Sequence, residues 1–270
     1  MPSLKISIVT ISYNQGRFLD QCINSVLGQD CPEVEYIVVD PGSMDGSREI
    51  IQKYSGRIKR TIFQPDSGPA HGLNTGFKAA SNEILGFINA DDRLLPGAIT
   101  SVLEYFEKNP GIDVLRGHGY QIDEGGNRVK KIFSTRWSAL AYAYGAVGIV
   151  QPATFFRKTA FESAGGFNVD NRTCWDGELL AAMAMAGARF GRTNAALGEF
   201  RLYGGSISGS GLRGRLWEKD RRRIEKMILG REKNAMDKYI GKGIRMWQII
   251  RDPRITIYKA AKRAIGNPCA

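Results

Sequence analysis

The sequence predicts an α/β fold built on a doubly wound sheet, because strand-like and helix-like segments alternate along the first hundred residues. Segments 5–12, 35–40 and 85–89 are short, apolar and rich in β-branched residues, as buried parallel strands are. Helical segments at 17–27 and 69–80 separate these strands. This alternation is typical of right-handed β-α-β crossovers, so we expect one large α/β domain.

Further elements are expected along the chain. Glycine, proline and asparagine mark their ends, and the Glu-Gly-Gly-Asn sequence at 124–127 predicts a hairpin turn. In chain order, these elements are a helix over 47–54, a strand over 60–64, a helix from about 96, a strand over 113–119, a hairpin of 120–123 with 128–133, a strand over 150–157, and helices over 159–164 and 174–186.

The composition limits the class of protein. With 270 residues, of which 43% are hydrophobic, the chain is long enough to bury a large core. No apolar run reaches about 18 residues, so we expect neither a membrane helix nor a signal peptide. We therefore expect a cytoplasmic location. The four cysteines lack CxxC spacing and only two histidines are present, which argues against a zinc site.

Positive charge is concentrated near the end of the chain. Residues 213–263 contain 17 of the 38 Lys and Arg residues but only 6 of the 27 Asp and Glu residues, so they hold the whole formal excess of +11. The Gly/Ser-rich stretch 204–211 before them reads as a linker or mobile loop. We therefore expect an α/β domain of residues 1–211 and a basic, mainly helical extension of residues 212–270, with helices at 213–226 and 245–263.

The basic extension has three interpretations. Its helices can lie on an anionic membrane surface, where each basic residue contributes about 1 kcal/mol. They can instead pack on the core, or form the contact of a homo-oligomer. Positive charge also permits nucleic-acid binding, but no segment resembles an RNA- or DNA-binding module, so we expect no nucleic-acid partner.

Carboxylates gather where the predicted strands end. The apolar run from Leu85 ends in Asp91 and Asp92, and Asp40 and Asp45 follow the second strand. Because parallel strands deliver their carboxyl ends to one edge of a sheet, these loops should form one crevice. A hard divalent cation held there can hold a pyrophosphate, which suggests a metal and a phosphorylated substrate together. The alternative is an Asp-Asp cap on the next helix.

Two common nucleotide-binding motifs are absent after the first strand. Neither the G-x-G-x-x-G turn of dinucleotide-binding domains nor the G-x-x-x-x-G-K-[ST] loop of nucleoside triphosphatases occurs there. Their absence argues against hydride transfer and against ATP hydrolysis.

Four segments, in this order, carry a family resemblance. They are Ile-Val-Thr-Ile-Ser-Tyr-Asn at 8–14, Val-Val-Asp-Pro-Gly-Ser-Met-Asp-Gly-Ser at 38–47, Ser-Gly-Pro-Ala-His-Gly-Leu-Asn-Thr-Gly-Phe at 67–77 and Phe-Ile-Asn-Ala-Asp-Asp at 87–92. Over roughly residues 4–210, the chain resembles the inverting glycosyltransferases of family two. The resemblance implies the GT-A fold, which is a Rossmann-like, doubly wound mixed sheet, and a nucleotide-sugar donor.

The resemblance also implies which residues bind the donor. The first two strand ends hold base and ribose, the segment at 66–74 closes over the sugar nucleotide, and Arg201 contacts diphosphate. The implied donor-binding residues are Thr10, Ser12, Tyr13, Asp40, Gly42, Asp45, Asp66, Gly68, Asn74, Asn89, Ala90 and Arg201. Two of them have local alternatives, because Asp45 can cap a helix and Arg201 can pair with Glu199 on a strand.

The metal motif departs from the Asp-x-Asp pattern of the family. Its first position is Asn89, so the match reads Asn89-Ala90-Asp91, and Asp92 follows. We expect Asp91 to ligate Mg²⁺ or Mn²⁺ with Asp92 as support, because Mg²⁺ commonly takes one or two carboxylates plus substrate phosphates. Such a cation would offset the charge that develops on the departing nucleoside diphosphate.

A second acidic motif lies on the helix expected at 174–186. The resemblance implies that Asp176 is the general base that takes a proton from the acceptor hydroxyl, with Gln151, Trp175 and Glu178 on the acceptor side. Alternatively, Asp176 and Glu178 only stabilise the positive end of the helix dipole. The Gln-x-x-Arg-Trp motif of processive synthases is missing, so one sugar per encounter is expected.

These expectations combine into one function. We expect a metal-dependent inverting glycosyltransferase that moves a sugar from a UDP- or dTDP-sugar to a glycan or lipid-linked acceptor. It would serve bacterial surface polysaccharide synthesis at the inner face of the cytoplasmic membrane. A catalytically silent subunit that binds nucleotide sugar or glycan is an alternative, because Asn89, Ala182 and Tyr203 depart from the family pattern. Nucleotidyl transfer to a sugar phosphate is another, although its Gly-rich first loop is absent.

Overall fold

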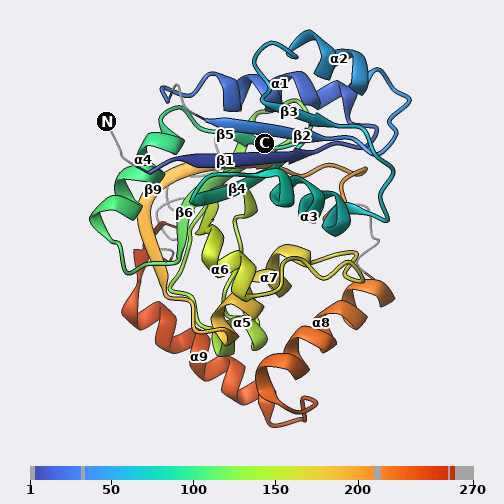
Figure 1. Cartoon of the computed structure of the whole chain (residues 1–270). Coiled ribbons are helices and arrows are strands. Elements are labelled where there is room, and N and C mark those ends of the chain that lie inside the picture. The colour runs from blue at the N-terminus through green and yellow to red at the C-terminus, as the bar shows by residue number, and fades with distance from the viewer. Residues whose placement is uncertain (1–3, 32–33, 210–213, 255, 259–270) are drawn as a thin grey trace.

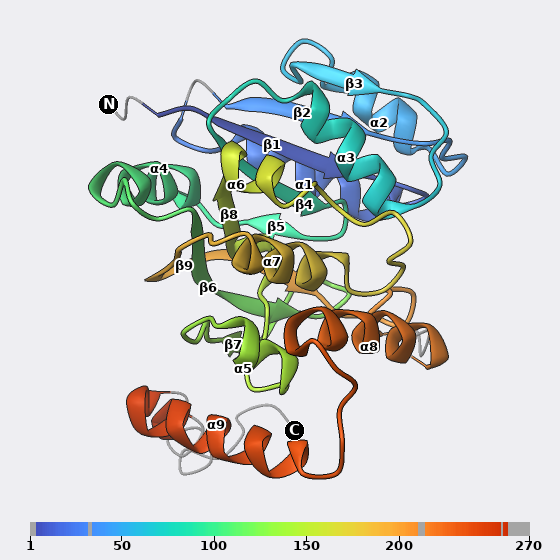
Figure 2. The same cartoon turned by 60° about the horizontal axis from the view of Figure 1, so that its bottom comes forward.

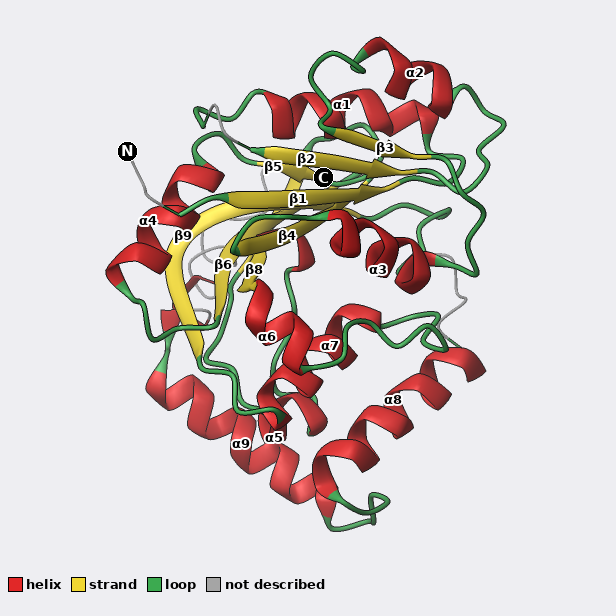
Figure 3. Cartoon of the chain, viewed as in Figure 1, coloured by secondary structure: helices red, strands yellow, loops and turns green. Residues whose placement is uncertain are grey.

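One mixed sheet of nine strands runs through the part of the chain that the structure describes, and helices cover both of its faces (Figures 1 and 3). The structure is a computed structural model, and it describes residues 4–31, 34–209, 214–254 and 256–258. The strand order is β3-β2-β1-β4-β8-β6-β9-β5, and β7 pairs with β6 outside this path. The predicted α/β fold with a mixed sheet is confirmed.

Four strands form the parallel half of the sheet. They are β1 (Ile6–Ile11), β2 (Glu35–Val39), β3 (Arg60–Ile62) and β4 (Ile84–Asn89). β1 pairs in parallel with both β2 and β4, so the carboxyl ends of these three strands meet at one edge. All three are buried over nearly their whole length, which explains their continuous apolar sequence.

Three helices cover this half on two sides, with α1 and α2 on one face and α3 on the other (Figure 1). They are α1 (Gly16–Leu27), α2 (Ser47–Lys53) and α3 (Pro69–Ala79). On α1, Leu19, Ile23 and Val26 lie at helical spacing and join the core beneath that face. On α3, Leu73 and Phe77 join the core of the opposite face. Burial of these stripes fixes both helices against the sheet.

The second half of the sheet is partly antiparallel. Its strands are β5 (Arg93–Leu94), β6 (Val114–Ile122), β7 (Arg128–Ile132), β8 (Thr154–Arg157) and β9 (Phe190–Arg201). β8 pairs antiparallel with both β4 and β6, and β9 runs parallel to β6. Two segments expected as separate strands, 113–119 and 120–123, are the single strand β6. The first part of the strand expected over 150–157 is a 3₁₀ turn, Gln151–Ala153, because Pro152 cannot donate to a ladder.

The helices of this half follow the sequence more closely than its strands do. They are α4 (Ala98–Lys108), α5 (Ala139–Ala143), α6 (Lys158–Ser163) and α7 (Trp175–Met185). Only α5 was not expected. The extent of β9 was also missed, because its sequence contains two glycines and no regular alternation of apolar and polar residues. Pairing with β6 and β5 outweighs this weak local preference.

Both helices of the basic extension contact the body of the protein, and Figure 2 shows α8 (Arg215–Leu229) beside α5 and α7. α8 contacts α5 and α7, and α9 (Asp237–Arg251) contacts α5, as the core-packing interpretation expected. The second helix begins earlier than the predicted position 245, because glycines at 241 and 243 weaken the local helical signal. The expected boundary at 211–212, the start of the first helix at 213 and residues 259–263 of the second lie outside the described residues.

Among the described residues, no helix is both long and apolar enough to cross a membrane.

Candidate active site

A cavity of about 640 Å³ opens where the parallel strands end. The ends of β1 and β4, the loop after β2, the segment before α3 and the start of α7 form its walls. The predicted residues that line it are Ser12, Tyr13, Gly42, Asp66, Gly68, Asn89, Ala90, Asp91, Gln151, Trp175 and Asp176. The structure therefore brings the predicted donor side, metal motif and general base into one cavity.

Each of the three strand ends carries one buried oxygen that has no hydrogen-bond partner among the described residues. These oxygens are Ser12 Oγ after β1, Asp40 Oδ2 after β2 and Asn89 Oδ1 at the end of β4. Ser12 and Asn89 line the cavity, and Asp40 directly precedes the lining residues Pro41 and Gly42. Because a buried unsatisfied acceptor costs about 1–3 kcal/mol, three at one sheet edge indicate a site for a ligand with several donors.

Asp40 is held rigidly by its other oxygen. Its Oδ1 accepts hydrogen bonds from the backbone of Gly42 and Ser43, at 3.0 and 2.8 Å. The same oxygen accepts from Arg48 Nε at 3.1 Å. The side chain is fully buried and does not itself line the cavity, so only Oδ2 is left to meet a ligand group that reaches behind Gly42.

A chain of two amides sets the orientation of Asn89. Gln151 Nε2 donates to the backbone carbonyl of Phe87 at 2.6 Å, so Gln151 Oε1 is the atom that accepts from Asn89 Nδ2, at 3.2 Å. Asn89 Nδ2 also donates to Asp92 Oδ2 at 3.3 Å. A backbone carbonyl only accepts, so the chain has one direction and leaves Asn89 Oδ1 as the free acceptor.

Asp91 is the acidic residue of the metal motif that lines the cavity. Burial raises the pKa of its carboxyl group, against a hydrogen bond from Tyr203 and the charges of Arg201 and Arg17, which lower it. Tyr203 is one of the residues that depart from the family pattern, and its ring lies 5.1 Å from that of Phe18. Its hydroxyl group hydrogen-bonds to the side-chain amide of Gln15 at 3.1–3.2 Å.

Asp92, which we expected to support the metal ligand Asp91, does not line the cavity. Its Oδ1 accepts from the backbone N–H of Arg201 at 2.8 Å, and its Oδ2 accepts from Asn89. Burial and the charge of Asp91 raise the pKa of Asp92 well above its usual value. Both oxygens already have protein donors, so this carboxylate links β4 to β9.

Arg201 has a buried guanidinium that lies outside the cavity lining. Its Nε donates to the carbonyl of Asp91 at 2.8 Å, and its Nη1 donates to the carbonyls of Asp123 and Glu124. Its Nη2 donates to Gln21 Oε1 at 3.0 Å. In this structure all three guanidinium nitrogens therefore have protein acceptors, and the contact with diphosphate stays a prediction.

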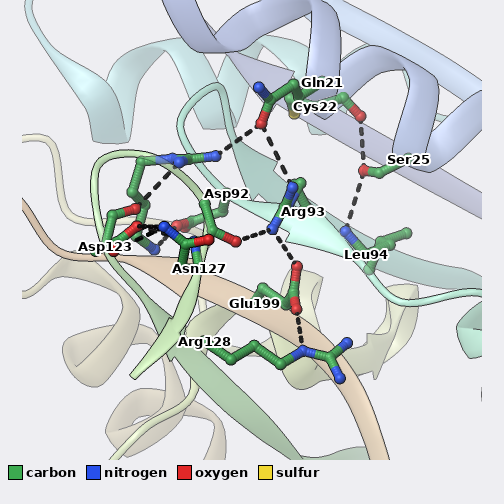
Figure 4. Close-up of polar contacts among 12 residues, drawn as sticks. Gln21, Cys22, Ser25, Asp92, Arg93, Leu94, Asp123, Asn127, Arg128 and Glu199 are labelled. Carbon is green, nitrogen blue, oxygen red and sulfur yellow. Dashed lines mark hydrogen bonds and ion pairs between the residues drawn. The ribbon is translucent and has the colours of Figure 1, made fainter. Parts of the chain in front are cut away.

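The local alternative, in which Arg201 pairs with Glu199 on a strand, is not found in the structure. Glu199 instead forms ion pairs with Arg93 at 2.7 Å and with Arg128 at 2.6 Å, as Figure 4 shows. Arg93 comes from β5, Arg128 from β7 and Glu199 from β9, so this triad joins three strands at the edge of the sheet.

Three other predicted donor residues hold the scaffold instead of lining the cavity. Thr10 is buried and accepts a hydrogen bond from the Tyr36 hydroxyl at 2.9 Å. The Asn74 amide both donates to and accepts from the backbone of Phe167, which fixes α3 to the loop after α6. Asp45 is exposed and ties together the first turns of α1 and α2, at Gly16 N (2.8 Å) and Ser47 N (3.1 Å), as the helix-capping alternative expected.

The segment before α3 is closed by a residue that the sequence did not suggest. Asp66 Oδ1 accepts from the backbone N–H of Gly68 at 2.8 Å, and Gly68 has φ of +126°, which favours glycine. Arg172 donates from Nη1 to the carbonyl of Ser67. This contact joins the donor-side segment to the loop that precedes α7, so Arg172 bridges the two sides of the cavity.

Asp176 and Trp175 occupy the first turn of α7 and line the opposite wall. Only glycine fits at position 177, because a Cβ atom there would lie 1.8 Å from the Tyr142 hydroxyl. The close contact of Gly177 with α5 therefore sets the position of the helix end that carries Asp176.

Glu178, which we expected on the acceptor side, is not among the residues that line the cavity. Its two oxygens accept from Arg223 Nε at 2.9 Å and Arg223 Nη2 at 2.7 Å, and also from Asn168 and Asn171. Burial would raise the pKa of Glu178, but these donors bring it below the usual value. The bidentate pair fastens α8 to α7.

A second contact from α8 holds the loop before α7. Asp220 is buried, and its Oδ2 accepts from the backbone N–H of Arg172 at 3.0 Å and from Thr173 Oγ1 at 2.8 Å. We refer to Glu178, Asp220 and Arg223 as the α8 clasp. Because the clasp holds both the helix and the loop that flank Asp176, the first helix of the extension is part of the site.

The stretch expected as a linker is another wall of the cavity. Gly205, Ser206, Ile207 and Ser208 line it, and Ser206 Oγ donates to the carbonyl of Tyr203 at 2.8 Å. Gln15, Pro65, Thr173 and Phe200 are further lining residues that the sequence did not indicate. A Gly/Ser-rich composition indicates a turn but cannot show that the turn folds back over a sheet edge.

No group of three or more His, Cys, Asp or Glu side chains in the described residues is arranged to hold a metal ion. The cavity does offer the Asp91 carboxylate and the unpartnered Asn89 Oδ1. One carboxylate and one amide oxygen suit a Mg²⁺-like cation that takes its remaining ligands from phosphate and water. The residues therefore fit a cation that is held jointly with a phosphorylated substrate.

A Rossmann-like sheet whose strand ends present acceptors and a carboxylate to one cavity defines a class of protein that binds a nucleotide at that edge. The sequence comparison narrows this class. Residues 7–165 match the family described as Glycosyl transferase family 2, and the chain belongs to this family. The family expectation from the sequence is thereby confirmed.

One curated relative and two solved structures show the range of similar proteins. A GalNAc(5)-diNAcBac-PP-undecaprenol beta-1,3-glucosyltransferase of Campylobacter jejuni is 33% identical over 104 residues, which is 37% of this chain and 34% of the relative. The crystal structure of S. aureus TarS 1-349 in complex with UDP-GlcNAc superposes with a TM-score of 0.68 at 18% identity, over 90% of this chain and 70% of that chain. Mannosyltransferase PcManGT from Pyrobaculum calidifontis, in complex with GDP-Man and Mn²⁺, superposes with a TM-score of 0.65 at 16% identity, over 99% of this chain and 78% of that chain.

These comparisons confirm the GT-A fold. Two further curated relatives have names that refer to polysaccharide synthesis in bacteria. They are a poly-beta-1,6-N-acetyl-D-glucosamine synthase of Staphylococcus epidermidis and a putative teichuronic acid biosynthesis glycosyltransferase of Bacillus subtilis. The chain spans less than half the length of the curated relatives that it matches.

The α8 clasp can be tested through stability. Arg223→Ala should lower the free energy of unfolding by about 1.5–3 kcal/mol, because a buried carboxylate loses its bidentate partner. Glu178 has a lowered pKa, so its contribution is present above the ordinary carboxyl range and disappears as the pH falls through the lowered value. Urea unfolding at neutral and acidic pH measures both effects.

The control for this test is Arg222→Ala on the same helix. Arg222 is exposed, and within the described part of the chain its ion pair is with Glu218 at 3.6 Å, so its removal should change stability by less than about 0.5 kcal/mol. Equal losses in the two variants, or a loss in Arg223→Ala that does not shrink in acid, would contradict the role given to the clasp.

Proposed function

We propose that the chain transfers a sugar from a nucleoside diphosphate-sugar to a hydroxyl of a glycan or lipid-linked acceptor, with inversion at the anomeric carbon. The observation that carries this proposal is the shared cavity, in which buried acceptors lie on the strand-end side and Asp176 lies on the α7 side. Membership of glycosyl transferase family 2 supports the same reaction class.

The three unpartnered oxygens favour a UDP- or dTDP-sugar. Uracil and thymine carry an N3–H donor, and the attached sugar ring of each nucleoside carries hydroxyl donors. Asp40 Oδ2, Ser12 Oγ and Asn89 Oδ1 are acceptors at the matching sheet edge, and two of them belong to side chains oriented by hydrogen bonds. Binding of such a nucleotide would satisfy groups that folding leaves unpaired.

Asp91, with the Asn89 amide oxygen, would hold a Mg²⁺ or Mn²⁺ ion that arrives with the diphosphate. When bound, such an ion neutralises charge on the leaving nucleoside diphosphate. The printed name of the Pyrobaculum neighbour includes Mn²⁺, which supports a divalent cation without fixing its identity. The chain itself supplies the orientation, because Tyr203 and the amide pair Asn89–Gln151 hold the side chains around Asp91.

Asp176 would act as the general base. It lies across the cavity from the metal motif, on the wall that also holds Trp175, whose ring offers an apolar face to an acceptor sugar. In this role the carboxylate accepts the proton of the acceptor hydroxyl while the hydroxyl oxygen attacks the anomeric carbon from the side opposite the diphosphate. One such in-line displacement inverts the configuration and needs no enzyme nucleophile.

The proposed acceptor is a glycan or a lipid-linked sugar. A lipid-linked acceptor at the inner face of the cytoplasmic membrane is supported by the name of the Campylobacter relative, which acts on an undecaprenol-linked glycan. We expect one sugar per encounter, because the Gln-x-x-Arg-Trp motif is absent from the sequence.

The first test of this proposal is Asp176→Asn. Loss of the base should lower the rate of sugar transfer by about 10²–10⁴-fold, whereas UDP should still raise the melting temperature, because the donor side is unchanged. Asp170→Asn is the matched control, since Asp170 is an exposed carboxylate before the same helix. A wild-type rate in Asp176→Asn would show that this residue is not the base, and UDP binding without transfer in the wild type would favour a silent binding subunit.

The second test concerns Asp91. UDP should raise the melting temperature of the wild type more in the presence of Mn²⁺ than in its absence. Asp91→Asn should abolish this Mn²⁺-dependent part of the rise, because the cation loses its protein carboxylate. In the wild type this Mn²⁺-dependent part should weaken as the pH falls through the raised pKa of Asp91, since protons compete with the cation. Thermal-shift titrations across pH measure both, and an unchanged Mn²⁺ response in the variant would remove Asp91 from the metal site.

A further inference from the structure

The face of α9 that contacts the protein is narrow and polar. Asp237 accepts a hydrogen bond from the Tyr144 hydroxyl at 2.9 Å, and Gln248 Nε2 donates to the carbonyl of Arg136 at 3.3 Å. Between them, Gly241 lies against Tyr144. These residues are spaced by four and by seven positions, about one and two helical turns, so they mark one side of the helix and fix which side must face outward.

The outward side of α9 is apolar over its whole length. At about 100° per residue, positions opposite the packed face hold large apolar side chains instead of polar ones. Ile250 is 73% exposed, Met246 64% and Trp247 50%. The exposed apolar residues along this stripe, which we call the α9 face, are Met236, Tyr239, Ile240, Met246, Trp247 and Ile250. Ile249, which is 50% exposed, lies outside the stripe, among the neighbouring basic residues. A continuous exposed stripe of this kind marks an interaction site.

Basic residues without acidic partners flank the α9 face. Lys238, Lys242 and Arg245 lie along one edge of the stripe, and Arg251 lies along the other, where its guanidinium is 4.9 Å from the Trp247 ring centre. None of these four forms an ion pair with a carboxylate of the described residues. Their charge is therefore available to an anionic partner.

The basic residues of α8 differ in this respect. Arg221 pairs with Glu225 at 2.8 Å, Arg223 with Glu178 at 2.7 Å and Lys226 with Glu232 at 3.4 Å. Much of the positive charge on α8 is thus neutralised within the protein. The unneutralised charge and the apolar stripe coincide on α9.

We propose that the α9 face lies on the surface of an anionic lipid bilayer. An exposed apolar stripe flanked by cations is the pattern of a helix that rests parallel to a membrane, with its apolar side chains among the lipid tails and its cations among the headgroups. Trp247 and Tyr239 suit the boundary between these layers. Each flanking cation strengthens attraction to anionic headgroups.

Two other partners fit the α9 face less well. A second copy of the chain would bring the unpaired cations of two α9 helices together, and the face offers no carboxylate to balance them. Nucleic acid would match the cations but would leave the central apolar stripe in water. An anionic lipid surface satisfies the charge and the stripe together.

The position of α9 allows this contact. In both views the helix lies at the end of the molecule opposite α1, α2 and β3 (Figures 1 and 2). The bilayer contact would give the proposed enzyme a lipid partner, but its test needs neither donor nor acceptor, so it can fail or succeed independently of sugar transfer.

The test is flotation of the full chain with vesicles of phosphatidylcholine, with and without phosphatidylglycerol. Wild-type protein should float only with the anionic vesicles, and Trp247→Glu combined with Ile250→Glu should abolish flotation. Replacing Lys242 and Arg245 by Gln should weaken binding by about five-fold for each cation removed. Leu216→Glu and Arg222→Gln on α8 are the matched controls and should bind as the wild type does.

Three outcomes would overturn the proposal. They are equal binding to neutral vesicles, no binding to either kind, and full binding by the Trp247→Glu and Ile250→Glu variant. Sedimentation velocity without vesicles checks the rival partner, because a wild-type dimer that the same variant dissociates, in the absence of vesicle binding, would assign the face to a second copy. The melting temperature of every variant, compared with that of the wild type, checks that the fold is intact.

Discussion

The buried guanidinium of Arg201 is the contact on which the donor side of the cavity depends. The guanidinium joins the end of β4, through the Asp91 carbonyl, to the turn after β6 and to α1. The backbone N–H of Arg201 donates to Asp92. Without this network, the motif after β4 would be a short exposed loop. With it, Asp92 is turned inward and Asp91 is left at the cavity wall. The positive charge also lowers the cost of burying two adjacent carboxylates, because each attracts the same cation.

The opposite wall depends on contacts from the other end of the chain. α7 carries Asp176, but the α8 clasp fixes the position of α7 and of the preceding loop. Arg172 then extends this support to the segment before α3. The two walls of the cavity are therefore connected by residues to which we assign no catalytic role. The basic extension has two separate parts, because α8 is bound into the site while α9 offers a surface to an outside partner.

The sequence predicted the parts of this site that are encoded locally. Ser12, Asn89 and Asp91 directly follow or end buried strands, and Asp176 begins a helix, so short motifs were enough to find them. It could not show which predicted residues contact distant segments of the chain instead of lining the cavity. Arg201 lies 180 positions from Gln21, Glu178 lies 45 from Arg223 and Asn74 lies 93 from Phe167. A charge or amide in a motif-like position looks the same in sequence whether it faces a ligand or another chain segment. Only tertiary packing decides between the two.

Asn89 shows how the departure from the family pattern fits the electrostatics. The end of β4 already holds two carboxylates whose pKa values burial raises, and Asp92 is fully enclosed. A third carboxylate at position 89 would face both of them and would lose the donation from Nδ2 to Asp92 and Gln151. An amide instead donates inward, where negative charge has collected, and keeps its carbonyl oxygen for a ligand. The chain thus keeps an oxygen acceptor at this position without another buried charge. The cost is that a cation bound there depends on Asp91 and on the phosphates that come with it.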